Sequence, residues 1–183
     1  MAVLAKILTV STSVAAGTTA DRGGDLVEET LLAAGLVVVA RAVVTDGVEP
    51  VRDALVALSE GFAGLIVTTG GTGFSPTDST PEGTKLAMER EAPGLAEAMR
   101  LSSPLGRLSR AVAGSRGTAL ILNTPGSPSG AKEYLDAVLD VVPHALALLS
   151  GENPHPHPVA AAERGGEHHA QHSDSAQPAR ELG

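Results

Sequence analysis

The residues best suited to chemistry are Thr68-Thr69-Gly70-Gly71-Thr72-Gly73, which combine three glycines with three threonine hydroxyls. They follow the apolar run 64–67, which is typical of a buried strand, and they precede a helix predicted to begin near Pro81. Glycine lets the backbone approach a ligand closely, and N–H groups ahead of a helix N-terminus attract anions. The segment therefore predicts a phosphate-binding loop, with an ordinary tight turn as the alternative.

This loop matches neither of two common nucleotide-binding motifs. It lacks the lysine of G-x-x-x-x-G-K-[ST], and its glycines do not have the spacing of G-x-G-x-x-G. Any anion must therefore be bound by backbone N–H groups and threonine hydroxyls. The helix that follows is predicted to begin with a capping box at Ser79-Thr-Pro-Glu82. The substrate-binding residues predicted here are Thr69, Gly70, Gly71, Thr72 and Gly73.

Two aspartates, Asp46 and Asp78, follow predicted strands and are expected to face one crevice. Each alone is typical of a turn residue that bonds to the nearby backbone. Two carboxylates beside a phosphate loop would repel a bare phosphate, so the pair suggests a bridging Mg²⁺. One of them could instead accept hydrogen bonds from an amino-substituted heterocycle.

A second Gly/Pro loop, Asn123-Thr-Pro125-Gly126-Ser127-Pro128, follows another predicted strand. It is either a rigid turn or a second ligand loop that offers N–H groups, the Ser127 hydroxyl and a helix N-terminus. Ser11 and Ser13 follow the first strand. Before the tail the sequence holds one histidine, His144, so no Ser/His/Asp triad is expected and the serines are predicted to bind substrate.

The elements that position these residues are read from hydrophobic periodicity. Strands are predicted at 3–10, 36–44, 65–68 and 119–122, with a short strand at 111–113 that pairs across 114–117. Helices are predicted at 25–34, 50–60, 81–100 (interrupted near Pro93) and 131–149. Their alternation indicates the α/β class, a three-layer α/β/α sandwich with a mostly parallel sheet. The loops at the carboxyl ends of its strands converge on one crevice.

The chain divides into a domain over 1–150 and a tail over 151–183 that is expected to be disordered. The tail holds four prolines and five of the six histidines, with almost no large apolar side chains. We expect no built metal site there.

The composition excludes several classes of protein. Aromatic residues make up 2% of the chain and the formal charge is −8, so binding to nucleic acid is not expected. There is no cysteine, which excludes disulfides and thiolate chemistry. No apolar run reaches the roughly 18 residues of a membrane span, and no signal peptide is recognised. A cytoplasmic protein is expected.

Several motifs together resemble the molybdenum cofactor biosynthesis family of the Mog/MoaB type. The resemblance covers about residues 3–151 in order and is specific as a combination. Besides the two Gly loops, it rests on Asp21-Arg-Gly-Gly24, Asp78-Ser-Thr-Pro-Glu82, Glu91-Ala-Pro-Gly94, Met99-Arg100 and Ser109-Arg110.

The resemblance implies an enzyme that adenylylates molybdopterin with Mg-ATP and releases pyrophosphate. It assigns catalytic roles to Asp46 and Asp78, a metal-binding role to Asp78, and ligand loops to 70–73 and 125–127. It also implies a homotrimer or hexamer, and hand-over of the product to a molybdate-inserting enzyme. Such inserting enzymes contain a related domain, but their additional large domains do not fit into 183 residues.

Two departures from the family pattern bear on activity. Thr77 stands where many members carry arginine, so one cation is missing, and Arg22, Lys85 or Lys132 would have to replace it. Gly83 stands where alanine is more usual, which weakens the helix start slightly. They keep open a second hypothesis, a non-catalytic trimer that binds and carries molybdopterin.

Overall fold

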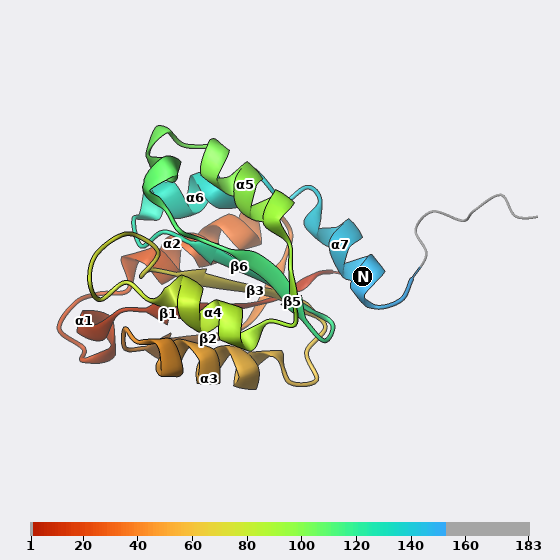
Figure 1. Ribbon diagram of the computed structural model, residues 1–183. Coiled ribbons are helices and arrows are strands. Elements are labelled where there is room, and N and C mark those ends of the chain that lie inside the picture. Colours follow the sequence, from red (N-terminus) through yellow and green to blue (C-terminus); the bar gives the residue numbers. More distant parts are fainter. Residues whose placement is uncertain (1, 153–183) are drawn as a thin grey trace, which may run out of the picture.

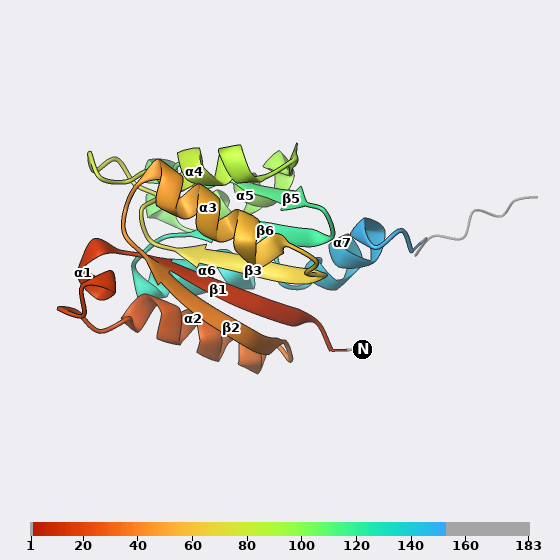
Figure 2. The same cartoon turned by 90° about the horizontal axis from the view of Figure 1, so that it is seen from below.

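A computed structural model describes residues 2–152 of the chain and shows one six-stranded sheet between two layers of helices (Figures 1 and 2). The strands are β1 (Leu4–Val10), β2 (Val37–Val44), β3 (Gly64–Thr69), β4 (Arg90–Glu91), β5 (Ala113–Arg116) and β6 (Ala119–Thr124). The helices are α1 (Thr12–Ala15), α2 (Arg22–Ala33), α3 (Val48–Ser59), α4 (Thr80–Ala87), α5 (Pro93–Leu101), the 3₁₀ helix η1 (Pro104–Leu108), α6 (Pro128–Asp136) and α7 (Val142–Leu149). The predicted α/β sandwich is confirmed.

The sheet order is β2-β1-β3-β6-β5-β4, and the four strands β2, β1, β3 and β6 run parallel. The chain leaves β1 toward β2 on one side, whereas β3 continues toward β6 on the other side. The order therefore reverses between β1 and β3. In open α/β sheets the carboxyl ends of the strands at such a reversal form the ligand crevice.

The two faces of the sheet bury different side chains, because successive residues of a strand point to opposite faces. Ile7 and Val67 pack with α2, α5, α6 and α7 on one face, and Leu8 and Ile66 pack with α3 and α4 on the other. β3 is buried along its whole length. A fully covered parallel strand requires the apolar run that precedes the glycine loop.

Two of the predicted helices are broken in the structure. The predicted helix 131–149 is two helices, α6 and α7, because Pro143 stands in the first turn of α7 and has no N–H for the carbonyl four residues earlier. The interruption predicted near Pro93 within 81–100 is confirmed, and it contains β4, whose Arg90 and Glu91 pair with Ser115 and Gly114. These pairings add a sixth strand that was not predicted from the sequence.

The predicted 111–113 strand lies further along the chain, as β5, and turns through Gly117 and Thr118. Gly117 has a φ of +53°, which favours glycine at a tight turn between antiparallel strands. The predicted domain ends within the described residues, and the predicted tail lies outside them from residue 153 on. Within residues 2–152, no helix combines the length and apolarity needed to cross a membrane.

Candidate active site

Two cavities adjoin at the carboxyl edge of the sheet, where β1, β3 and β6 end. The first, which we call the Asp78 cavity, has a volume of about 440 Å³, and the second, the Ser11 cavity, about 460 Å³. Gly71 and Gly126 line both, so the two glycine-containing loops form the ridge between them. Of the predicted substrate-binding residues, the Asp78 cavity is lined by Gly71, Thr72, Gly73, Pro125, Gly126 and Ser127, and the Ser11 cavity by Ser11, Ser13, Thr69, Gly70, Gly71 and Gly126.

The glycine loop is held by hydrogen bonds to the carbonyls of Gly70 and Gly71 and by one from the N–H of Gly70. Gly70 has a φ of +104° and donates its N–H to the carbonyl of Thr124 over 3.2 Å. Thr80, at the start of α4, donates its hydroxyl to the carbonyl of Gly70 and its N–H to the carbonyl of Gly71, over 2.8 and 3.0 Å. The Thr69 hydroxyl donates to the carbonyl of Pro125 over 2.9 Å, which links the two loops.

The N–H groups of these loops remain available for a ligand. Within residues 2–152, no acceptor pairs with the backbone N–H of Gly71, Thr72, Gly73, Gly126 or Ser127. Thr72 is buried, whereas Gly126 and Ser127 are exposed, and all five N–H groups belong to residues that line the two cavities. Unpaired N–H groups on successive residues of a loop can bind an anion. The anion-binding role of the loops stays a prediction, and these N–H groups are its physical basis.

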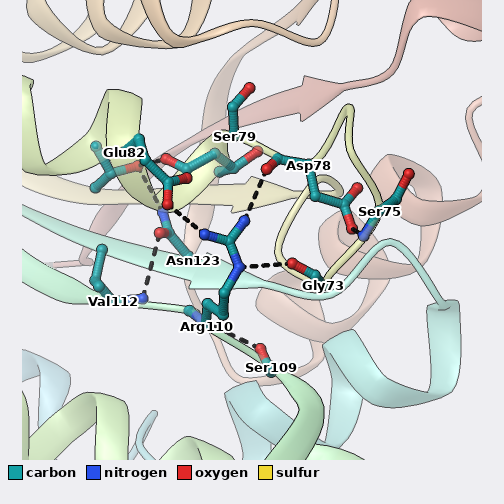
Figure 3. Close-up of polar contacts among 12 residues, drawn as sticks. Gly73, Ser75, Asp78, Ser79, Glu82, Ser109, Arg110, Val112 and Asn123 are labelled. Atoms are coloured by element: carbon teal, nitrogen blue, oxygen red, sulfur yellow. Dashed lines mark hydrogen bonds and ion pairs between the residues drawn. The ribbon is translucent and has the colours of Figure 1, made fainter.

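Arg110 ties the loop that carries Asp78 to the body of the protein (Figure 3). Its guanidinium donates to the carbonyl of Gly73 and to the carbonyl of Asp78, each over 2.7 Å, and forms an ion pair with Glu82. Its backbone N–H donates to the carbonyl of Thr72 over 2.8 Å. In the sequence Arg110 belongs to one of the family motifs, but no role was predicted for it.

Replacing Arg110 with alanine is expected to loosen the loop over residues 72–78. The variant loses two bonds to backbone carbonyls from a charged donor, so we expect hydrogen exchange to rise about tenfold or more at the amides of Ser75 and Asp78, which are hydrogen-bonded within the loop. The exchange rate in Arg110→Lys should lie between those of the wild type and Arg110→Ala, because one ammonium group cannot make all the hydrogen bonds of a guanidinium group. Arg52→Ala, which removes an exposed arginine paired with its neighbour Asp53, is the control. Unchanged exchange in Arg110→Ala would contradict the role of Arg110.

The capping box predicted at the start of α4 does not form, because Arg110 pairs with its glutamate. Ser79 is the N-cap of this helix, but its hydroxyl donates to the carbonyl of Thr77 and makes no capping bond. Glu82, the other half of the predicted box, is paired with Arg110. The prediction of the box was wrong because a residue 28 positions later in the chain competes for the glutamate.

The two aspartates do not share a cavity. Asp78 lines the Asp78 cavity and accepts the Ser75 N–H over 3.1 Å with one carboxylate oxygen. Asp46 lines neither cavity, and one of its carboxylate oxygens accepts the backbone N–H and the hydroxyl of Thr12 over 2.9 and 2.7 Å. The expectation that both face one crevice is therefore corrected. Asp46 lies after the edge strand β2 and anchors the start of α1.

Asn123 also lies outside the cavities. It is fully buried in β6, its amide NH₂ donates to the hydroxyls of Thr68 and Thr84, each over 2.9 Å, and its oxygen accepts the N–H of Val112. Because both donors and the acceptor are used inside the protein, this side chain has a structural position. The predicted substrate contact at Asn123 is corrected on these grounds.

The three cations suggested as replacements for the arginine missing at position 77 lie in different places. Arg22 lines the Ser11 cavity. Lys132 is paired with Asp136 over 2.5 Å and lines a separate cavity between α2 and α6, and Lys85 is exposed on α4. Arg22 is therefore the candidate that the fold brings to the site. Thr77 itself is exposed and lies 3.1 Å, hydroxyl to hydroxyl, from Ser75.

Asp21 is a further polar residue of the Ser11 cavity. Burial acts to raise the pKa of this carboxyl, but hydrogen bonds from the Gly24 N–H, from Arg41 and from the Thr9 hydroxyl outweigh it and lower the pKa below its ordinary value of 3.8. The Arg41 contact measures 2.7 Å. This network fixes the entry to α2 beside Arg22.

The lowered pKa of Asp21 predicts how its contribution to stability depends on pH. A carboxyl whose pKa is depressed by folding stabilises the protein above its unfolded pKa, and this stabilisation is lost as pH falls through the folded value. We expect Asp21→Asn to lower Tm by about 3 °C or more at pH 7. The difference in Tm between wild type and variant should narrow below pH 3.8. A difference in Tm that stays constant with pH would contradict this account.

No group of three or more His, Cys, Asp or Glu residues suited to holding a metal ion occurs within residues 2–152. This arrangement is compatible with Mg²⁺ because that ion commonly uses one or two carboxylates together with substrate phosphates. Asp78 has one carboxylate oxygen on the Ser75 N–H and stands in a cavity wall beside unpaired N–H groups. A single carboxylate of this kind fits a metal that arrives with its phosphate ligand.

Residues 6–144 match a family described as "Probable molybdopterin binding domain". Among curated proteins, the chain is 38% identical over 114 residues to the molybdopterin adenylyltransferase of Helicobacter pylori strain J99. That match covers 60% of this chain and 65% of the relative, so the chain spans less than two thirds of the relative's length.

Solved structures resemble the fold over nearly their whole length. The molybdopterin biosynthesis enzyme MoaB of Thermus thermophilus is 46% identical with a TM-score of 0.75, over 82% of this chain and 98% of that one. The molybdopterin biosynthesis Mog protein of Mycobacterium ulcerans is 43% identical with a TM-score of 0.74, over 81% and 99%.

Proposed function

The chain belongs to the molybdopterin-binding domain family, and we propose that it is a molybdopterin adenylyltransferase of molybdenum cofactor biosynthesis. The reaction would join molybdopterin to AMP from ATP and release pyrophosphate. The names of the similar proteins support this proposal, and so does the form of the site.

The observation that carries the proposal is the pair of cavities with a common ridge. An adenylyl transfer brings two anionic substrates together, and each needs a place of its own beside the point of transfer. Gly71 and Gly126 line both cavities, and their N–H groups have no acceptor within residues 2–152. A phosphate group on either side of the ridge could be bound by these N–H groups.

The chemistry requires no strong base. The phosphate of molybdopterin is already ionised at neutral pH, and one of its oxygens forms a bond to the α-phosphorus of ATP. The bond from that phosphorus to the bridging oxygen breaks, and pyrophosphate leaves with the electron pair. The main obstacle is repulsion between two polyanions, so the protein contributes by positioning them and by offsetting charge.

Several residues of the site contribute to positioning the substrates and offsetting their charge. The N–H groups of 71–73 and 126–127 bind phosphate oxygens, and Arg22 adds a positive charge from the Ser11 cavity. Asp78 would hold Mg²⁺, which supplies charge neutralisation when bound. Asp46 acts through Thr12 and the start of α1 and is a positioning residue in this proposal.

The proposal extends to the assembly and the setting of the protein. A homotrimer or hexamer, a cytoplasmic location and hand-over of the product to a molybdate-inserting enzyme are proposed from the family alone. Light scattering of the purified protein tests the first of these.

Incubation with molybdopterin and Mg-ATP tests the proposed activity, with pyrophosphate release as the measurement. Release that depends on both substrates and on Mg²⁺ supports the transferase. Tight binding of molybdopterin without pyrophosphate release would support a non-catalytic carrier instead. The absence of a cation at Thr77 favours this alternative. Restoring the charge with Thr77→Arg then distinguishes a weakened enzyme, whose rate rises, from a carrier, whose rate stays at zero.

A further inference from the structure

The hydroxyl group of Tyr134 is buried and has no hydrogen-bond partner within residues 2–152. Tyr134 lies on α6 and is 1% exposed. Its ring packs in the apolar core between the sheet and the helix layer that includes α5 and α6. Packing explains the ring but leaves the hydroxyl unexplained. A buried hydroxyl without a partner destabilises a protein, and phenylalanine would fill the same space without that cost.

The same residue lines the Asp78 cavity. The wall beside it comes from η1 and its flanks, which contribute Ser103 and Ser109 as polar residues and Leu105 and Leu108 as apolar ones. The two leucines are 73% and 60% exposed, although side chains of this kind are usually covered. This part of the cavity, which we call the η1 recess, therefore combines apolar surface with hydroxyl groups.

Such a lining suits a flat heterocycle, whose faces are apolar and whose edges carry hydrogen-bonding nitrogen and oxygen atoms. A phosphate group does not fit it, because none of the residues that η1 and its flanks contribute to the cavity lining is cationic, and the unpaired N–H groups belong to other residues, 71–73 and 126–127. The cavity lining thus includes both N–H groups that could bind an anion and apolar side chains.

We propose that the η1 recess binds the heterocycle of a substrate and that the Tyr134 hydroxyl recognises its edge, directly or through one ordered water. This inference rests on the proposed function, from which it takes the two candidate rings, the pterin and the adenine. The ligand gives the hydroxyl the partner that the protein does not provide. Tyr134 is then a specificity-determining residue of the Asp78 cavity.

The variant Tyr134→Phe tests the inference, because it removes the hydroxyl and keeps the ring. Binding of Mg-ATP alone and of molybdopterin alone is measured by calorimetry, so that no turnover is needed. We expect Kd for one of the two to rise about fivefold to twentyfold. The affected ligand identifies the ring in the recess. The Tm of the ligand-free variant should stay unchanged or rise, since no bond within the protein is lost.

Ser59→Ala is the matched control. Ser59 is another buried hydroxyl, but it donates to the carbonyl of Leu55 over 2.7 Å on α3, on the other face of the sheet. Its removal should lower Tm and leave both Kd values unchanged.

Three results would overturn the inference. In the first, Tyr134→Phe binds both ligands as the wild type does, which leaves the proposed function intact. In the second, Tyr134→Phe has a lower Tm and its Kd values for both ligands rise by the same factor, as expected of a purely structural hydroxyl. In the third, the wild type binds neither ligand, in which case the proposed function has failed as well.

Discussion

Replacing Asp78 with asparagine is expected to lower the rate of pyrophosphate release at least about 100-fold, with little change in Tm. Asparagine has the same shape and can still accept the Ser75 N–H, which is the bond that Asp78 makes through its carboxylate. What it removes is the negative charge in the wall of the Asp78 cavity. If that charge holds Mg²⁺, the variant should also need a higher Mg²⁺ concentration for half its maximal rate.

Two other aspartates serve as controls for this prediction. Asp53→Asn removes an exposed charge on α3 that is paired with Arg52, and it should leave the rate unchanged. Asp46→Asn should lower the rate less than Asp78→Asn, because Asp46 lies outside both cavities and its contacts to Thr12 can be kept in part. An Asp78→Asn enzyme with the wild-type rate would remove Asp78 from the proposed reaction. A larger loss of rate in Asp46→Asn than in Asp78→Asn would indicate that Asp46 takes a direct part in the reaction.

The sequence predicted the loops of the site better than the side chains that support them. Gly70 to Gly73 and Pro125 to Ser127 lie at the carboxyl edge as expected, because glycine and proline mark turns through local backbone geometry. Arg110 could not be found in this way. It reaches Gly73 and Asp78, which lie 37 and 32 positions away, and no periodic pattern encodes such contacts.

Asn123 and Asp46 show a second limit, which concerns boundaries and neighbours. The predicted strand ended at residue 122, whereas β6 continues to Thr124, so Asn123 lies inside the sheet and pairs in register with Thr68. Asp46 does follow a strand, but periodicity does not tell which strand is at the edge. An error of one or two residues at a boundary was enough to change a buried structural amide into a predicted ligand.

The ridge between the cavities depends on close contact between backbones, and this makes Gly70 the most sensitive position in the glycine loop. A Cβ atom at Gly70 would lie 2.3 Å from the carbonyl oxygen of Val10. That oxygen belongs to the backbone of β1, so no side chain can rotate to relieve the contact. The φ of +104° adds strain for any residue with a Cβ.

Gly70→Ala is therefore expected to destabilise the fold by about 3 kcal/mol or more, which corresponds to a fall in Tm of roughly 6–12 °C for a domain of this size. The part of this loss that comes from φ alone can be measured at Gly61. Gly61 has a φ of +60°, and a Cβ there would meet nothing within 4 Å. Gly61→Ala should cost about 1 kcal/mol.

The difference between the two variants isolates the contact with β1. If the strands at the reversal point hold the ridge rigidly, Gly70→Ala should also lower binding of both substrates, because the N–H groups of Gly71 and Gly126 would move together. Gly61→Ala should keep both affinities, since it lies at the far end of β3. Equal losses of Tm in the two variants would mean that the loop shifts freely away from Val10, and the ridge could then not position two substrates.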